Sequence, residues 1–145
     1  MPVTDITALA QQYGADVIVD AEHSWGQLDF DVPDLQALFA GAKAKEARLR
    51  ALRDAWAEPA RAIPGVQVLT NADPSMTAGI TAFRIEGRSS QDVATALRER
   101  FGVFTIMRPG LAKGEVVRAT PALFSRMSDA QRLLEGIDTL ARENR

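Results

Sequence analysis

The sequence predicts a two-layer α+β sandwich, ordered strand, strand, helix, strand, strand, helix (ββαββα) and preceded by a short helix–strand unit of the α/β kind. The first observation behind this prediction is the succession of strand and helix patterns from Pro64 onward. The second is a short, continuous apolar run at residues 17–19, which is typical of a strand buried on both faces. The third is the composition, because 145 residues with 46% apolar content are sufficient for a hydrophobic core.

The bulk properties exclude several classes of function. A net charge of −2 gives no electrostatic reason to expect binding to nucleic acid or to anionic membranes. The absence of cysteine excludes disulfides, a thiolate nucleophile and a zinc–thiolate site, and no metal site is expected. No apolar run is long enough to span a bilayer, and the first residues do not resemble a secretory signal. We therefore expect a cytoplasmic protein.

The first elements suggest half of a βαβ unit. Residues 4–13 have apolar side chains at helical spacing, and Gly14 stands where a helix commonly ends. The buried strand at residues 17–19 follows and ends at Asp20, and His23, the only histidine in the chain, comes three residues later. Polar groups just past the carboxyl end of a parallel strand lie where open α/β sheets bind ligands. The alternative is that they are ordinary polar residues of a strand-to-loop turn.

A long helical stretch comes next. Asp34 can cap a helix over residues 35–42, and a second apolar stripe follows at Leu49, Leu52, Trp56 and Ile63. Pro59 is expected to end or kink this helix. The basic residues of the stretch are interpreted as a solvated helix face, because acidic residues are interspersed and no aromatic platform accompanies them: Lys43, Lys45, Arg48, Arg50 and Arg53.

The remainder contains the elements of the predicted sandwich. Strands are expected at residues 66–69, 77–85, 103–107 and 115–120. In the second of these, Thr81, Phe83 and Ile85 share one face. A helix capped by Ser89 or Ser90 ends at Gly102, and a capping box at residues 128–131 begins the last helix, whose buried stripe is Leu133, Leu134, Ile137, Leu140 and Ala141.

The segment ADVIVDAEHSWGQLDF, residues 15–30, resembles the aspartate-bearing strand of the class V aminotransferases. These are fold-type I enzymes that use pyridoxal phosphate (PLP), and the isopenicillin N epimerase-like branch is the most similar. The resemblance implies PLP as cofactor and two cofactor-binding residues. Asp20 would pair with the protonated pyridine nitrogen of PLP, and His23 would lie beside the ring and its phenolic oxygen.

Residues 46–143 resemble the carboxyl-terminal small domain of the same family, including its lead-in helix. The diagnostic stretch is VVRATPALF, residues 116–124, where the family has an arginine followed by a hydroxyl residue and proline. By this resemblance Arg118 binds the substrate carboxylate, a task suited to a planar guanidinium fork. The alternative is a strand-end arginine paired with an acid or with solvent. The implied domains are residues 1–42, a remnant of the PLP-binding large domain, and residues 43–145, the small domain.

The family's Schiff-base lysine has no counterpart in this sequence. In the family a histidine directly precedes that lysine, and Lys43, Lys45 and Lys113 all lack this context. The glycine-rich helix start that binds the cofactor phosphate is also missing. No catalytic residue is therefore assigned. The resemblance implies a truncated family member without independent catalysis, because PLP chemistry needs a lysine to hold the cofactor and to move the α-proton.

Two alternatives remain open at this stage. The first is an assembly protein or homo-oligomer, in which the exposed large-domain strand pairs with another chain. The second is a PLP enzyme whose site is completed by a partner chain. Its substrate would be an amino acid, and its reaction transamination, epimerisation or β/γ-elimination.

Overall fold

The computed structural model describes residues 3–15, 17, 42–71, 73–109 and 114–143. The expected strand at residues 17–19, apart from Val17, and the expected helix at residues 35–42, apart from its last residue, lie outside the described residues. Among the described helices, none combines the length and the apolar character needed to cross a membrane. The elements in chain order are α1 (Val3–Gln12), α2 (Ala42–Ala60), β1 (Val66–Val68), η1 (Pro74–Met76), β2 (Thr81–Ile85), α3 (Ser90–Phe101), β3 (Ile106–Arg108), β4 (Val116–Ala119) and α4 (Met127–Arg142).

The four strands form one antiparallel sheet in the order β1-β2-β4-β3. β4 is therefore a central strand of the sheet, although it is the last of the four strands in chain order. Its register pairs Arg118 with Ala82 of β2 on one side and with Ile106 of β3 on the other. The helices and the antiparallel sheet agree with the predicted α+β architecture at this level of detail.

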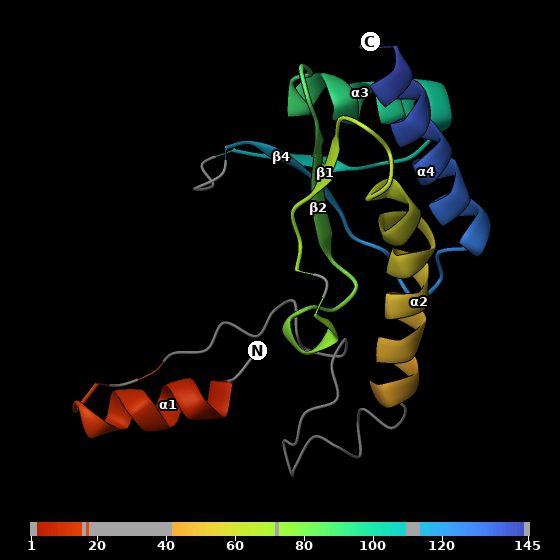
Figure 1. Ribbon diagram of the computed structural model, residues 1–145. Helices are drawn as coiled ribbons and strands as arrows, with labels where there is room; N and C mark the ends of the chain where they lie inside the picture. Colours follow the sequence, from red (N-terminus) through yellow and green to blue (C-terminus); the bar gives the residue numbers. More distant parts are fainter. Residues whose placement is uncertain (1–2, 16, 18–41, 72, 110–113, 144–145) are drawn as a thin grey trace.

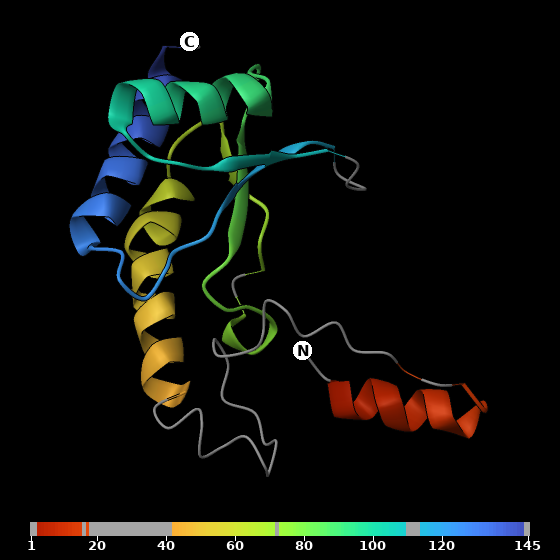
Figure 2. The same cartoon turned by 180° about the vertical axis from the view of Figure 1, so that it is seen from behind.

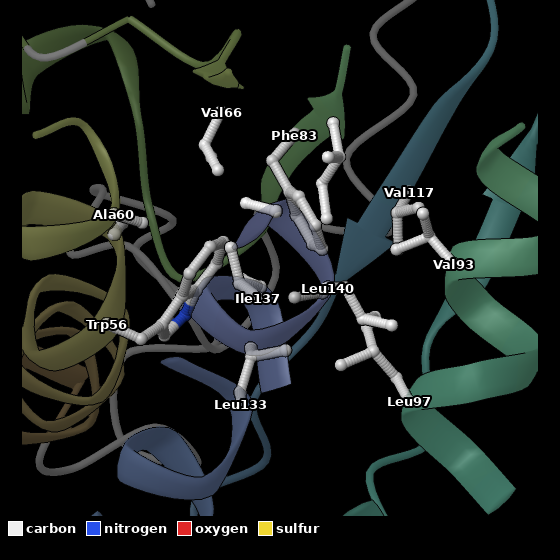
Figure 3. Close-up of a cluster of buried hydrophobic side chains, with 14 of the residues drawn as sticks. Trp56, Ala60, Val66, Phe83, Val93, Leu97, Val117, Leu133, Ile137 and Leu140 are labelled. Carbon is white, nitrogen blue, oxygen red and sulfur yellow. The ribbon is translucent and has the colours of Figure 1, made fainter. Parts of the chain in front are cut away.

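Three helices cover one face of the sheet and form the second layer (Figures 1 and 2). α4 lies between its two neighbours, α2 packs near β1, and α3 packs near β3 and β4. The core between the layers brings Trp56 of α2 edge-on to Phe83 of β2, with ring centroids 5.5 Å apart (Figure 3). The other central core residues labelled in Figure 3 are Ala60, Val66, Val93, Leu97, Val117, Leu133, Ile137 and Leu140.

α1 stands apart from this two-layer body in both views (Figures 1 and 2). Its predicted helical stripe is present but is not buried. Ile6 is 51% exposed, Leu9 is 57% exposed and Tyr13 is 82% exposed. The apolar face of α1 thus has no extensive cover from the other described elements.

Several predicted boundaries shift for local reasons. β2 begins at Thr81 rather than at residue 77, and the preceding short helix η1, capped by Asp73 through the Ser75 N–H, ends at Met76. β3 covers residues 106–108 rather than 103–107. α2 ends at Ala60, one residue after Pro59, so the proline lies in the last turn, close to the predicted end of the helix.

Caps were predicted for α3 and α4, and only the prediction for α3 is confirmed. Ser89 caps α3 by accepting the Asp92 N–H, and Gly102 ends it with a φ of 65°, both as predicted. The predicted capping box at residue 128 is wrong, since α4 starts at Met127. Asp129 reaches back to the backbone N–H of Arg126 at 2.9 Å, which places the cap two residues earlier.

Gly136 permits the close approach of α3 and α4. A Cβ atom at this position would lie 2.6 Å from Leu97 Cδ2 and 3.1 Å from Phe101 Cγ. Leu97 is fully enclosed in the core, so it has little room to move away. The absence of a side chain at Gly136 is therefore a packing requirement of the helical layer.

We predict that Gly136→Ala destabilises the chain by about 1–2 kcal/mol, because overpacking outweighs the helix propensity that alanine adds. Urea unfolding followed by circular dichroism measures this difference. The control is Glu135→Ala, at the exposed neighbouring position, which is expected to change stability by less than about 0.5 kcal/mol. Stabilisation by Gly136→Ala would show that α3 and α4 are not in close contact.

Candidate functional site

The candidate site is the sheet face opposite the helices, with Arg118 at its centre. Side chains alternate between the two faces of a strand, and the flanking residues Val117 and Ala119 are 0% and 5% exposed within the helix-covered core. Arg118 consequently projects from the other face. On that face its cross-strand neighbours are Ala82 and Ile106, both without charge.

The Arg118 guanidinium has an enclosed donor. Its Nε atom is screened from solvent and has no hydrogen-bond partner among the described residues. An enclosed donor without an acceptor is unfavourable for folding, because its hydrogen bond to water is lost and not replaced. The carboxylate partner that the sequence analysis left open as an alternative is thus not supplied by the described part of the chain. An incoming carboxylate would satisfy this guanidinium.

Two further arginines lie on the same face. Arg84 follows Ala82 at the strand period of two, and Arg108 follows Ile106 in the same way. The Arg84 Nε donates to Gln67 Oε1 at 2.9 Å, and Gln67 Nε2 in turn donates to Glu86 at 2.8 Å. Neither arginine was predicted as a site residue. Both alternate with apolar side chains along their strands, however, and this alternation indicates that they project from the face opposite those side chains.

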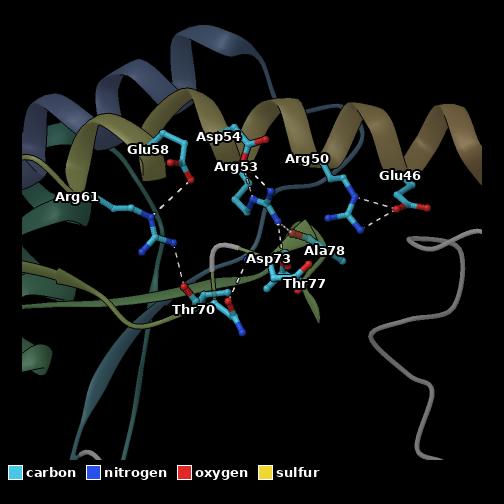
Figure 4. Close-up of polar contacts among 11 residues, drawn as sticks. Glu46, Arg50, Arg53, Asp54, Glu58, Arg61, Thr70, Asp73, Thr77 and Ala78 are labelled. Carbon is cyan, nitrogen blue, oxygen red and sulfur yellow. Dashed lines mark hydrogen bonds and ion pairs between the residues drawn. The ribbon is translucent and has the colours of Figure 1, made fainter. Parts of the chain in front are cut away.

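Arg53 positions the segment that leads into β2, the strand beside Arg118 (Figure 4). Its Nη1 donates to Thr77 Oγ1 at 2.8 Å and to the Ala78 carbonyl at 2.7 Å, and its Nε donates to Asp54 at 2.7 Å. Arg53 is only 7% exposed. The prediction that it belongs to a solvated helix face is therefore wrong, because two of its three partners, Thr77 and Ala78, come from a segment distant in sequence.

Arg61, directly after α2, makes a second, more exposed connection to the same part of the chain (Figure 4). Its Nη2 donates to the Thr70 carbonyl at 2.9 Å, and its Nε lies 3.5 Å from Glu58. Together Arg53 and Arg61 join α2 and the residue that follows it to the end of β1 and to the connection between β1 and β2. These bonds fix the segment that leads into β2, the strand paired with Arg118.

The predicted cofactor site cannot be assembled from the described residues. Asp20 and His23 both lie outside them, as does Lys113. Lys43 and Lys45 are in the first turn of α2, in the helical layer and not on the face that carries Arg118. The described residues therefore provide a candidate carboxylate-binding arginine but no amine beside it that could hold PLP.

This chain was compared with protein-family models, with curated proteins and with solved structures. No protein-family model matches this sequence. No curated protein matches it either. Solved structures do match, at 12–17% sequence identity and over 72–75% of this chain. The chain spans only 24–26% of the length of those structures.

Three of the similar structures show which proteins match and how closely. A mutant of the lyase C-DES with glycine covalently linked to its PLP cofactor aligns with a TM-score of 0.55 at 17% identity, covering 72% of this chain and 26% of its own. Tryptophan decarboxylase from Catharanthus roseus aligns with 0.59 at 12% identity, covering 75% and 24%. A glutamate decarboxylase domain from Vibrio parahaemolyticus aligns with 0.52 at 17% identity, covering the same shares. Most of this chain therefore shares its fold with about a quarter of each of these structures.

We predict opposite outcomes for the same substitution at two arginines. Arg118→Met removes an enclosed donor without a partner, so stability should change by less than about 0.5 kcal/mol or increase. Arg53→Met leaves the Ala78 carbonyl and Thr77 without their donor and should cost about 2 kcal/mol. Urea unfolding of both variants beside the unmodified chain tests this. A loss at position 118 as large as that at position 53 would mean that Arg118 has a structural partner.

Proposed function

We propose that this chain is a class V aminotransferase-like protein that carries the family's small domain and does not catalyse PLP chemistry on its own. The assignment to class V, and to its isopenicillin N epimerase-like branch, rests on the sequence around Asp20 and on the stretch after Val116. The fold shared with fold-type I enzymes agrees with it at a coarser level.

The observation that carries the proposal is Arg118 on the helix-free face of a central strand, with its Nε enclosed and unpaired. In the proposed role Arg118 receives the α-carboxylate of an amino acid when a large domain is packed against this face. Thr120 and Pro121 follow it in the order that the family shows. The apolar neighbours Ala82 and Ile106 leave the guanidinium charge available to a ligand.

The lack of independent catalysis follows from the lysines. Each of the three lysines differs in context from the family's Schiff-base lysine. Lys43 and Lys45 are placed on α2, in the layer opposite Arg118. Asp20 and His23 would then have no covalently held cofactor to orient. The alternative that retains catalysis is a PLP site completed by a partner chain. The Schiff-base lysine of that site would have to come from the partner.

A second candidate function is assembly with another chain. The observation that favours it is the apolar stripe of α1, in which Ile6, Leu9 and Tyr13 are all more than half exposed. Burial of such side chains contributes favourably to association, by about 25 cal/mol for each Å² removed from water. In this alternative the two-layer body is retained as a scaffold, and Arg118 has no ligand.

The first test is titration of the full chain with PLP, observed in the visible region, followed by borohydride reduction and peptide mapping. We expect no saturable aldimine band and only scattered, substoichiometric adducts, because no lysine of the sequence has the context of the family's Schiff-base lysine. A stoichiometric phosphopyridoxyl group on one lysine would overturn the proposal. Lys43→Arg, Lys45→Arg and Lys113→Arg then identify the residue responsible.

Sedimentation velocity separates the second candidate from the first. If α1 mediates assembly between copies, the chain sediments as an oligomer, and Leu9→Lys shifts it toward the monomer by burying a charge in the contact. Glu135→Lys, at an exposed site on α4, is the matched control and should leave the distribution unchanged. A strictly monomeric chain across the accessible concentration range argues against assembly of the chain with itself.

A further inference from the structure

A second site is suggested by a cavity on the helical side of the sheet, which is lined in part by Thr120 and Pro121 but not by Arg118. It lies between α2, the connection from α3 to β3, the end of β4 and the first turns of α4. Its volume is about 330 Å³, within the range of small-molecule pockets in proteins. Ala119, which lines it, belongs to the helix-covered face of β4, whereas the neighbouring Arg118 belongs to the other face.

The floor of the cavity is apolar and rigid. Leu52, Trp56 and Leu133 line it, and they are 1%, 2% and 5% exposed, respectively. Trp56 is held from behind by its edge-on contact with Phe83 (Figure 3). Because these side chains are already fixed in the core, the apolar atoms that they present to the cavity need no ordering on binding. The ligand portion that contacts this floor should accordingly be apolar or aromatic.

The charged rim of the cavity has more free donors than acceptors. Arg126 and Arg132 line it, and no hydrogen bond or ion pair joins their guanidinium groups to another described residue. Asp129 is the one carboxylate among the lining residues, and it already accepts the backbone N–H of Arg126. Thr105 also lines the wall, is 8% exposed, and its Oγ1 has no partner among the described residues.

We propose that this cavity binds a small carboxylate with an aromatic or apolar body. The apolar portion would contact Trp56 and Leu133, and the carboxylate would accept hydrogen bonds from Arg126 and Arg132 at the rim. Guanidinium and carboxylate form charge-assisted hydrogen bonds that are stronger than neutral ones. The proposal is independent of the role of Arg118 and of PLP, because its residues lie on the other side of the sheet.

The test uses 3-phenylpropionate as probe and the full chain carrying Trp25→Phe, so that Trp56 is the one tryptophan and its fluorescence reports the cavity floor. We expect a saturable change in emission with a Kd on the order of 1 mM. The uncharged amide, 3-phenylpropionamide, should bind at least about fivefold more weakly, because it cannot form the charge-assisted pair.

Arg126→Gln combined with Arg132→Gln should raise the Kd for the carboxylate by about tenfold and leave the Kd for the amide unchanged. Arg98→Gln, an exposed arginine of α3 outside the cavity lining, is the control and should leave both values within about twofold. Thermal unfolding verifies that each variant is folded. The proposal is overturned by the absence of saturation, by equal affinity for acid and amide, or by an unchanged Kd in the double variant.

Discussion

The packing of α4 against its neighbouring helices and the sheet is the interaction on which the rest of the structure depends. Gly136 lets α3 approach α4, and the apolar stripe of α4 fills the space above β2. The helical layer buries one face of the strands, and the other face carries Arg84, Arg108 and Arg118 beside the apolar residues Ala82, Ile106 and Val116. The asymmetry of the core thus determines where charge can be displayed.

Short-range patterns predicted most of the two-layer body. The alternation of Thr81, Phe83 and Ile85 correctly indicated the buried face of β2, and the α4 stripe gave the core helix. Features that depend on distant partners were missed. Arg53 was predicted as exposed because nothing in its own helix reveals that Thr77 and Ala78 accept its hydrogen bonds. For the same reason the strand pattern alone could not show that the Arg118 Nε is unpaired.

Fold and site give different degrees of support to a functional assignment. The likeness to solved structures extends over most of this chain but over only about a quarter of theirs, and at these identities it concerns the fold alone. The feature that agrees best with the proposed carboxylate-binding small domain is Arg118, whose Nε has no partner among the described residues and which lies on a sheet face opposite the described helices of the two-layer body. The predicted cofactor residues Asp20 and His23 lie outside the described residues, so their role remains a proposal.

The central claim is that the face carrying Arg118 is partly open to solvent, with Ala82 and Arg118 half-buried, whereas the opposite face is buried. Because the chain has no cysteine, single substitutions give an unambiguous thiol signal, and Ala82→Cys and Ala119→Cys probe the two faces on paired strands. The most direct measurement is the rate of labelling by a charged thiol reagent in the native state. We predict ready labelling at position 82, and labelling at position 119 only through transient unfolding, slower by at least about 100-fold. Equal rates at the two positions would contradict the account.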